Sequence, residues 1–443
     1  MKYDVLIIGA GPGGYTAANK ASENGLKVAL FEKDKVGGTC LNRGCIPMKS
    51  LIESAHILED SKNASLYGLE INNPSFDYEK VNTRKDEVVN TLRDGIIKGL
   101  NKNNVDIIYG KARIIEEHKI LCNEEIYEGD NIIIASGSVV SIPSIEGKDL
   151  CITSDDILEK NYKLPTSLTI IGGGVIGVEI ADALNAFGVK INIIEMFDRL
   201  IPTLDKDLGQ RLNMFFKKKD IGVYTSAKVQ RIKEENNKKI VEYLNNKDEL
   251  VSIESDEVLI ATGRRANIEN ISDLDIKQER GIIGDEIGKT NYANIFVLGD
   301  AKDKNIQLAH NAEAQGVNII DYILNKELTN DISVIPSGIY TSPEIAAVGR
   351  SEEELKNKNI EYITKKYLTG ANGKCLIENA ESGFVKIILV DDVIVGGQII
   401  APHATELIGE LAIAIQKKMK INDLAKVIHP HPTISEMIWN VCK

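Results

Sequence analysis

One pattern constrains the fold of this chain more than any other: an apolar strand, a glycine loop, a helix and a second apolar strand that ends in an acidic residue. It first spans 3–32, where the loop GAGPGG leads into a helical stretch and the second strand ends at Glu32. It returns 163 residues later, with GGGVIG as the loop and Glu195 as the acidic residue. In both copies the first loop glycine precedes the acidic residue by 23 positions. The repeat predicts an α/β chain with two Rossmann-like units.

Each loop carries three glycines in G-x-G-x-x-G register, and each glycine has an expected role. The first makes the tight turn, the second lets a pyrophosphate approach the backbone, and the third lets helix and strand pack closely. The helix N-terminus then faces the phosphates, and the acidic residue binds ribose hydroxyls. Glycine used for packing alone is the alternative, but two copies with matched acidic partners favour two bound dinucleotides. The residues are Gly9, Gly11, Gly14 and Glu32 in the first copy and Gly172, Gly174, Gly177 and Glu195 in the second.

Two cysteines lie five positions apart in GGTCLNRGCIPMKS, which follows the first unit. In a regular helix their Cα atoms would be roughly 8 Å apart, outside the ~4.4–6.8 Å that a disulfide tolerates, so Cys40 and Cys45 can bridge only where the segment bends. Gly44 lets the backbone bend, and Pro47 lacks the N–H that a regular helix would use. If the turn after Pro47 is helical, Lys49 shares a face with Cys45 and favours its thiolate. Two unrelated buried cysteines are the alternative, which the surrounding motifs disfavour.

Composition and charge exclude several classes of function. With 443 residues, 43% of them apolar and 27% charged, the chain is typical of a soluble protein of about two to four domains. The net charge of −12 is spread along the chain and argues against nucleic acid or membrane as a partner. One close cysteine pair beside four single cysteines indicates a reducing compartment and a catalytic dithiol. Neither a signal peptide nor a membrane span is expected, so we predict a cytoplasmic protein without a metal site.

Small-residue turns follow later strands in both units. The segment 132–134 runs into Ala-Ser-Gly, which ends at Gly137, and 258–260 runs into Ala-Thr-Gly, which ends at Gly263. Amphipathic helices are expected at about 50–60 and 78–103.

A further strand, 295–298, leads into Gly299-Asp300. An aspartate just past a buried strand end is suited to bind a polyol hydroxyl, although capping a helix or turn is a fair alternative. The sequence LAH then opens a helix at about Ala309 that runs to about 324.

The pattern of expected strands and helices changes from about residue 333. Short strands are followed by an apolar helix, 404–418, and by the tail HPHPTISEM. This order predicts an α+β domain whose sheet is covered by helices on one face. Before it, the polar run 233–250 is expected to form an exposed hairpin that carries no site.

In this order the motifs resemble those of the FAD-dependent pyridine nucleotide–disulfide oxidoreductases, most closely the dihydrolipoamide dehydrogenases. The resemblance covers essentially the whole chain and is highly specific for the superfamily. GAGPGG is similar to the FAD fingerprint, GGTCLNRGCIPMKS to the redox-disulfide helix, and GGGVIGVE to the NAD fingerprint. ATGRRAN resembles the end of the NAD unit, and IFVLGDA with LAHNAEAQG the second FAD segment. YTSPEIAAVG resembles the start of the interface domain and HPHPTISE the C-terminal catalytic signature.

The resemblance implies an FAD-binding domain, an NAD-binding domain and a C-terminal α+β dimerisation domain. The implied ranges are 1–143 for the first part of the FAD-binding domain, 144–266 for the NAD-binding domain, 267–332 for the second part of the FAD-binding domain and 333–443 for the interface domain.

The resemblance also implies catalytic roles for named residues. Cys40 exchanges with a dithiol substrate, and Cys45 lies against the flavin and passes electrons to it. His431 is the base that keeps the attacking thiol ionised, and Glu436 orients its ring.

Cofactor contacts follow from the same resemblance. Lys49 pairs with Glu179 beside the flavin and the nicotinamide. Asp300 holds the ribityl chain, and the helix at Ala309 directs N–H groups at the pyrimidine edge of the flavin, where reduction builds negative charge.

The implied activity is the oxidation of dihydrolipoamide, carried by a lipoyl domain or protein of a 2-oxoacid dehydrogenase or glycine cleavage complex, with NAD as acceptor. The implied assembly is a homodimer in which His431 serves the other subunit. Three departures from the family pattern loosen the substrate prediction: Arg43 stands between the cysteines, Met48 stands where Ser or Thr is usual, and Gln315 replaces a commonly acidic residue.

Three alternative functions stay open. A glutathione reductase would use NADPH and need basic residues near Glu195. A mercuric reductase would end in a cysteine pair, where this chain has only Cys442. A non-catalytic flavin-binding protein is disfavoured because Cys40, Cys45, His431 and Glu436 are all present.

Overall fold

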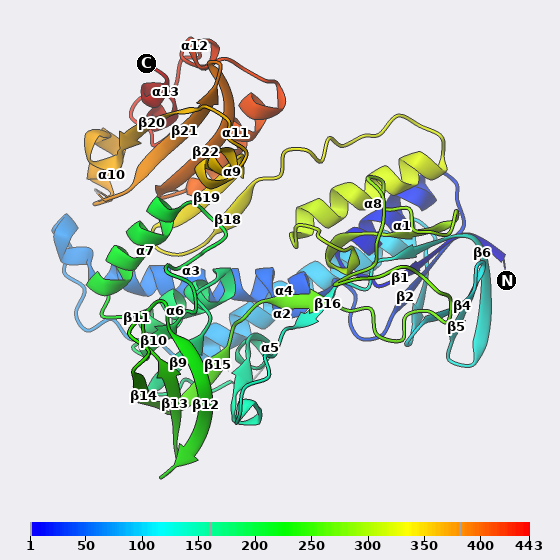
Figure 1. Cartoon of the computed structure of the whole chain (residues 1–443), viewed down its shortest axis with the longest axis horizontal. Helices are drawn as coiled ribbons and strands as arrows, with labels where there is room; N and C mark the ends of the chain where they lie inside the picture. Colours follow the sequence, from blue (N-terminus) through cyan, green and yellow to red (C-terminus); the bar gives the residue numbers. More distant parts are fainter. Residues whose placement is uncertain (1, 160–161, 381) are drawn as a thin grey trace.

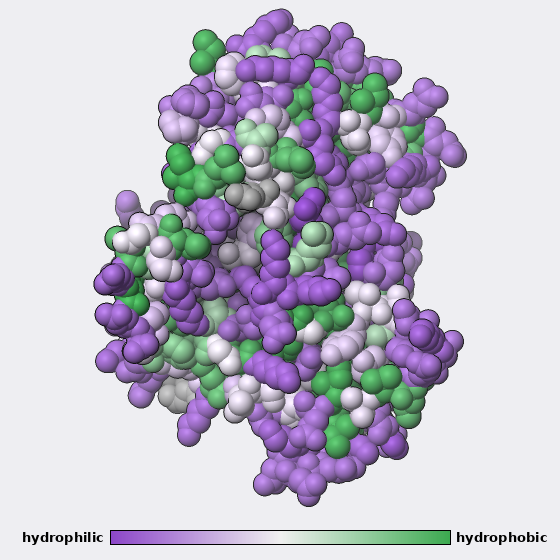
Figure 2. All heavy atoms as spheres, turned by 90° about the vertical axis from the view of Figure 1, so that its left-hand side faces the viewer, coloured by the Kyte–Doolittle hydropathy of each residue, from purple (hydrophilic) through white to green (hydrophobic). Residues whose placement is uncertain are grey.

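The structure is a computed structural model that describes residues 2–159, 162–380 and 382–443. Three sheet-centred regions make up the molecule (Figure 1). The N-terminal sheet lies on the right of Figure 1, the second parallel sheet at the lower left and the C-terminal sheet at the upper left. The face on the left of Figure 1 is largely hydrophilic, and Figure 2 shows its apolar side chains in separate groups.

The first sheet has seven strands in the order β3-β2-β1-β6-β5-β4, with β17 also paired to β6. The pairs of β1 with β2 and β6, of β2 with β3 and of β6 with β17 are parallel, whereas β4, β5 and β6 pair antiparallel. Residues far apart in sequence therefore meet at the carboxyl ends of β1, β6 and β17. The strands are β1 (Lys2–Ile8), β2 (Val28–Glu32), β3 (Asp106–Tyr109), β4 (Arg113–Glu116), β5 (Lys119–Cys122), β6 (Glu125–Ile134) and β17 (Ile295–Val297).

Helices α1 and α8 lie side by side on this sheet (Figure 1). The first glycine loop leads into α1, and the Gly299–Ala301 turn precedes α8. A longer pair, α3 and α4, packs together and reaches toward the second sheet, where α3 contacts α6. The helices are α1 (Pro12–Glu23), α2 (Gly38–Arg43), α3 (Cys45–Lys62), η1 (Ala64–Tyr67), α4 (Tyr78–Lys102), η3 (Gly299–Ala301) and α8 (Ala309–Ile323).

The second sheet is entirely parallel, in the order β11-β10-β9-β15-β8. It repeats the β1–α1–β2 arrangement as β9–α6–β10, so the predicted duplication and the α/β class are confirmed. A two-stranded ladder, β7 with β16, joins this region to the first. The elements are β7 (Ser138–Val140), η2 (Lys148–Leu150), β8 (Ile152–Thr153), α5 (Ser154–Leu158), β9 (Ser167–Ile171), α6 (Val175–Ala186), β10 (Lys190–Ile194), α7 (Lys206–Lys218), β11 (Gly222–Tyr224), β15 (Glu257–Ile260) and β16 (Arg264–Ala266).

The polar run 233–250 differs from the expected exposed hairpin. It belongs to a three-stranded antiparallel sheet of β12 (Lys228–Glu235), β13 (Lys238–Leu244) and β14 (Leu250–Ser255). Asn236 and Asn237 both have positive φ, as a tight two-residue hairpin turn requires. The third strand, β14, pairs with the other edge of β13. Val241 and Tyr243 are buried because they pack against strands of the second sheet, in a core that includes Ile194.

The C-terminal sheet is five-stranded and antiparallel, in the order β18-β19-β22-β21-β20. Helices α11 and α13 cover one face, as predicted. The other face is also buried: Ile399 packs under these helices, whereas its neighbour Ile400 joins the core formed with α3 and α6. The elements are β18 (Ser337–Ile339), β19 (Glu344–Gly349), α9 (Glu352–Asn357), β20 (Ile363–Leu368), η4 (Thr369–Ala371), α10 (Gly373–Ile377), β21 (Phe384–Val390), β22 (Val393–Ala401), α11 (Ala404–Gln416), α12 (Ile421–Leu424) and α13 (Glu436–Cys442).

Candidate active site

A cavity of about 1600 Å³ runs between the first two sheets and is bordered by the start of the C-terminal sheet. It brings together most of the predicted site residues. Gly14 and Gly177 lie outside its lining, as do His431 and Glu436. The predicted residues that line it are Gly9, Gly11, Glu32, Cys40, Cys45, Lys49, Gly137, Gly172, Gly174, Glu179, Glu195, Gly263, Asp300 and Ala309.

The two glycine loops have nearly the same backbone geometry. Gly9 has φ of 105° and Gly172 has φ of 113°, in the left-handed region that favours glycine. Gly14 and Gly177 pack the helix onto the loop, because a Cβ there would lie 1.9 and 2.1 Å from the carbonyl oxygens of Gly9 and Gly172. At Gly174 nothing lies within 4 Å of the position that a Cβ would take, so the helix start is open to a ligand.

The two acidic residues are held in the same way. Glu32 accepts hydrogen bonds from the backbone N–H groups of Ala10 and Asp34, both at 2.8 Å. Glu195 accepts from Gly173 at 2.6 Å and Phe197 at 2.8 Å. Each carboxylate is buried next to its own glycine loop. Each of its oxygens keeps a lone pair that can accept a further hydrogen bond. These carboxylate oxygens can accept hydrogen bonds from the ribose hydroxyls of a dinucleotide in each loop, so the residues present fit FAD in the first and NAD in the second.

The cysteine segment bends between its two thiols. Helix α2 ends at Arg43 and α3 begins at Cys45, with Gly44 between them at φ −143° and ψ −115°. Pro47 lies in the first turn of α3, where no backbone donor is needed, so this helix begins about five residues earlier than expected. Cys40 and Cys45 are not bridged in the structure, so their disulfide stays a prediction.

The two thiols differ in ionisation. A hydrogen bond between them raises the pKa of Cys40, and burial raises it further. The same hydrogen bond lowers the pKa of Cys45 to about 7, and the charge of Lys49 acts in the same direction. Cys45 is therefore the better thiolate of the pair and the better leaving group in disulfide exchange.

Lys49 lies one helical turn after Cys45 on α3. Its Nζ donates to both carboxylate oxygens of Glu179 on α6, at 3.0 and 2.8 Å. Glu179 is buried, and its Oε1 also accepts from the backbone N–H of Tyr340 at 3.0 Å. The Lys49 ammonium stands 4.5 Å from the ring centre of Tyr340.

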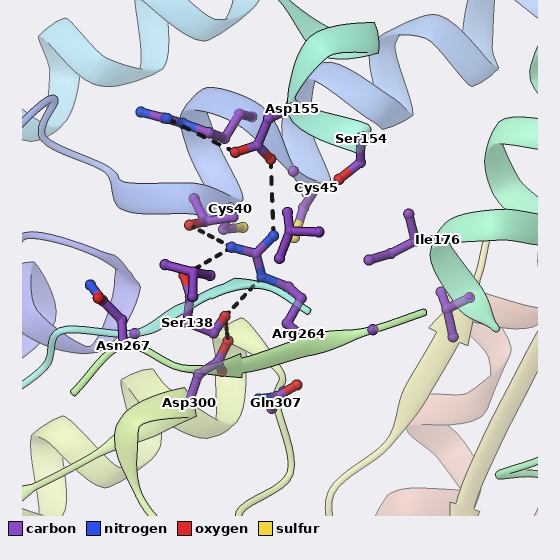
Figure 3. A pocket seen from close by; sticks show the side chains of 18 of the residues that line it. Cys40, Cys45, Ser138, Ser154, Asp155, Ile176, Arg264, Asn267, Asp300 and Gln307 are labelled. Carbon is purple, nitrogen blue, oxygen red and sulfur yellow. Dashed lines mark hydrogen bonds and ion pairs between the residues drawn. The ribbon is translucent and has the colours of Figure 1, made fainter. Parts of the chain in front are cut away.

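Arg264 is a site residue that the sequence analysis did not single out. Figure 3 shows its guanidinium beside the two cysteines, between Ser138 and Asp155. It donates to Ser138 Oγ at 2.8 Å, and Ser138 Oγ donates to Asp300 at 2.5 Å. Asp155 lies 4.0 Å from it, and burial raises the pKa of that carboxyl. The ATGRRAN motif was the available signal, since Arg264 follows its glycine directly.

The departures Gln315 and Arg43 have defined contacts. The buried amide of Gln315 accepts from Gly299 N–H at 2.9 Å and donates to Asn305 at 2.9 Å, so it fixes the turn that carries Asp300. Arg43 pairs with Asp34 and lies 4.0 Å from Asp155. Met48 is buried in the core.

His431 and Glu436 form a pair away from the cavity. His431 Nδ1 lies 3.0 Å from Glu436 Oε1, and the His431 side chain is 79% exposed. A hydrogen bond from Thr433 N–H, helped by His431, lowers the pKa of Glu436, which therefore stays ionised. The pair is assembled as predicted, but its ring faces solvent in the single chain. The neighbouring His429 contacts Glu410 at 2.8 Å and stacks on Trp439.

Two family models match the chain. The model described as pyridine nucleotide-disulphide oxidoreductase matches residues 3–316. The model described as pyridine nucleotide-disulphide oxidoreductase, dimerisation domain, matches residues 335–442.

Known relatives extend over the whole chain. A dihydrolipoyl dehydrogenase of Bacillus subtilis is 36% identical, covering 99% of this chain and 96% of the relative. One from Mycoplasma genitalium is 34% identical, covering 100% of this chain and 98% of the relative. Among solved structures, the Cu(II) complex of the HOCl-induced flavoprotein disulfide reductase RclA from Escherichia coli is similar with a TM-score of 0.88 and 26% identity, covering 100% of this chain and 99% of that one.

Proposed function

The chain belongs to the pyridine nucleotide-disulphide oxidoreductases, and from this we propose that it is a dihydrolipoyl dehydrogenase with FAD and NAD as cofactors. One observation supports this most directly. A single cavity contains two equivalent glycine loops, each with its buried acidic residue, and the Cys40–Cys45 dithiol between them. Two dinucleotides and a dithiol are the parts that electron transfer from a dithiol to NAD requires.

Each residue is proposed to hold a defined part of a cofactor. Gly11 and Glu32 would bind the pyrophosphate and ribose of FAD, with Asp300 on the ribityl chain and the N-terminus of α8 at Ala309 beside the flavin. Gly174 and Glu195 would bind NAD in the same manner. When bound, FAD would take the two electrons of the dithiol and NAD would accept them as a hydride.

The dithiol is proposed to react by thiol–disulfide exchange. A thiolate of the substrate attacks Cys40 Sγ, the Cys40–Cys45 bond breaks, and Cys45 leaves as a thiolate. The second substrate thiolate attacks the mixed disulfide, which releases Cys40 and closes the lipoamide ring. The substrate loses two electrons and two protons, and the cysteine pair gains the electrons. Lys49 stabilises the Cys45 thiolate as it forms.

A base must accept the substrate protons, and His431 is proposed for this role with Glu436 orienting its ring. Because His431 is exposed and lies outside the cavity lining of its own chain, we propose that it serves the site of a second subunit. The match to a dimerisation domain supports a homodimer. Exposed apolar residues of the C-terminal domain, among them Ile413 and Ile428, are candidates for the interface.

The physiological substrate is proposed to be a lipoyl group carried by a domain or protein of a multienzyme complex. A cytoplasmic location is proposed with it. Among the helices of the described residues, none combines the length and apolarity needed to cross a membrane.

The proposed function is tested by assays on the purified protein. We expect release of FAD on denaturation, oxidation of free dihydrolipoamide with NAD, and little reduction of glutathione disulfide or mercuric ion with NADPH. Reduction of glutathione disulfide without dihydrolipoamide activity would instead support the glutathione-reductase alternative. Absence of flavin would contradict both.

A further inference from the structure

Three regions of the molecule meet at the ammonium group of Lys49. Lys49 comes from α3 of the first region and Glu179 from α6 of the second, whereas Tyr340 directly follows β18 of the C-terminal domain. Tyr340 contacts both partners: its backbone N–H donates to Glu179 Oε1 at 3.0 Å, and its ring centre lies 4.5 Å from Lys49 Nζ. All three residues line the cavity that contains Cys45.

We propose that Tyr340 is a positioning residue whose ring holds the Lys49 ammonium where its charge acts on Cys45. The C-terminal domain then fixes the charge beside the dithiol as well as providing the dimerisation surface. This proposal rests on the proposed function and deepens it, because Cys45 is proposed to leave as a thiolate in that chemistry.

Tyr340 restrains the position of the Lys49 ammonium, which Glu179 alone does not fix. The side chain of Lys49 is 29% exposed, so the ammonium can turn toward solvent while it keeps one contact with Glu179. An aromatic face attracts an ammonium electrostatically and disfavours such rotamers. Glu179 also carries a negative charge near Cys45, which opposes the thiolate, so the benefit of Lys49 depends on where its ammonium stands.

The charged and titratable groups around Cys45 come from several elements. Cys40 lies on α2, Lys49 on α3 and Glu179 on α6. The negative charge of Glu313 on α8 raises the pKa of Cys40. The guanidinium of Arg264 also lies beside the two cysteines, with Asp155 at 4.0 Å from it (Figure 3). Lys49 is the positive charge that lowers the pKa of Cys45, and it is the one that the ring of Tyr340 contacts.

The test measures the pKa of Cys45 in the full-length, flavin-containing protein. The background is Cys40→Ser, so that Cys45 is the remaining thiol of the pair. The thiolate is followed by its ultraviolet absorbance against pH, as the difference from the Cys40→Ser/Cys45→Ser protein. Tyr340→Leu should raise the pKa and reduce the thiolate fraction at neutral pH by roughly 2- to 10-fold, the range expected for a cation–π contact. Tyr340→Phe keeps the ring and should keep the titration curve.

Matched variants separate this role from a general packing effect. Tyr322→Leu removes another tyrosine that contacts a lysine, Lys289 at 5.9 Å, away from the cavity, and should leave the titration unchanged. If Tyr340→Leu folds poorly, Tyr340→Ile replaces it, because a β-branched side chain suits the extended backbone beside β18.

Two results would overturn the proposal: an unchanged titration in the aliphatic variants, or the same shift in Tyr340→Phe. The measurement needs neither dihydrolipoamide nor NAD. A wild-type protein that fails to oxidise dihydrolipoamide would therefore contradict the proposed function while the titration still decides the role of Tyr340.

Discussion

Cys40 and Cys45 line one cavity but are predicted to fail differently when substituted. Cys40→Ser should keep the contact between the Cys45 thiolate and the flavin, together with its long-wavelength absorbance, but lose turnover because the thiol that exchanges with the substrate is gone. Cys45→Ser should lose both the absorbance and turnover. Absorbance spectra and dihydrolipoamide oxidation rates are measured for each variant. Cys151→Ser, outside the pair, is the control, and identical spectra of the Cys40 and Cys45 variants would contradict the assigned roles.

Glu195 is expected to make the protein select NAD over NADP. Its carboxylate is fixed by two backbone N–H groups, so it cannot turn away from a ribose 2′-phosphate. The charge repulsion and the lost hydrogen bond should cost about 2–4 kcal/mol in kcat/KM. The measurement compares kcat/KM for NADH and NADPH in the wild type and in Glu195→Ala. The preference should shrink in the variant, and equal values in the wild type would exclude this role.

Residues with local roles could be predicted from the sequence pattern itself, whereas the Lys49–Glu179 pair, 130 positions apart, followed only from the family resemblance. The glycine loops and their acidic residues follow from spacing alone, because each acts on its own loop. Arg264 bonds to Ser138, 126 positions away, and Tyr340 to Glu179, 161 positions away. Neither contact leaves a periodic signal in the chain. Only the fold brings these residues to the cysteines.

At the scale of elements, strands and helices with strong patterns are found close to their predicted bounds. Strand β10 spans Lys190–Ile194 as expected, and α11 ends at Gln416, two residues early. The predicted start of α3, at about residue 50, is wrong: the helix begins at Cys45, because proline is compatible with a first helical turn. The strand β14 was not predicted, although Val251 and Ile253 alternate with exposed polar residues and pack against a core.

A buried ion cluster joins α7 to the C-terminal sheet and provides a stability prediction. Lys386 on β21 is fully buried and lies 3.0 Å from Asp205, 2.9 Å from Asp207 and 2.9 Å from Glu352. Lys386→Met leaves these carboxylates without their central cation and should lower the free energy of unfolding by about 3–5 kcal/mol. Urea titration measures the change.

The matched control for this variant is Lys304→Met. Lys304 pairs with Glu279 at 3.0 Å but is 76% exposed, so its loss should cost less than about 1 kcal/mol. If Lys386→Met were as mild as this control, the cluster would not stabilise the domain contact.

The same cluster predicts a pH dependence of stability. Burial raises the pKa of Asp207, but hydrogen bonds and charges from Lys366 and Lys386 outweigh it and leave the pKa below its ordinary value. A carboxyl whose folded pKa is depressed stabilises the fold above its unfolded pKa, about 3.9, and this stability is lost as pH falls through the folded pKa. Urea titrations at neutral and acidic pH should therefore show a smaller loss for Asp207→Asn than for the wild type. An equal loss would argue against this contribution.

At the scale of the whole molecule, the class of each region was predictable but the packing between them was not. The sequence predicts that helices cover one face of the C-terminal sheet. In the structure both faces are buried, because the adjacent residues Ile399 and Ile400 of β22 belong to two different cores. A strand buried on both faces gives a continuous apolar run, which does not say what lies on the second face. The contact with α3 and α6 that fixes Tyr340 against Glu179 therefore needs the three-dimensional structure.

The last prediction concerns how two chains share a site. His431 and Glu436 are preassembled at 3.0 Å, but the ring is exposed and lies outside the lining of the cavity with Cys40. A base from a second chain would complete each site in a two-fold dimer, and obligate interfaces of this kind bury roughly 2,000 Å² or more. The inactive variants Cys40→Ser and His431→Ala are therefore mixed under conditions of subunit exchange. Each heterodimer then has one site with both groups and one with neither, so about half of the wild-type activity per heterodimer should return.

Mixing Cys40→Ser with Cys45→Ser is the control, because both lesions lie on the cysteine side and neither site of that heterodimer is complete. Demonstrated exchange without recovery in the first mixture, or full activity of a stable monomer, would mean that His431 serves its own chain.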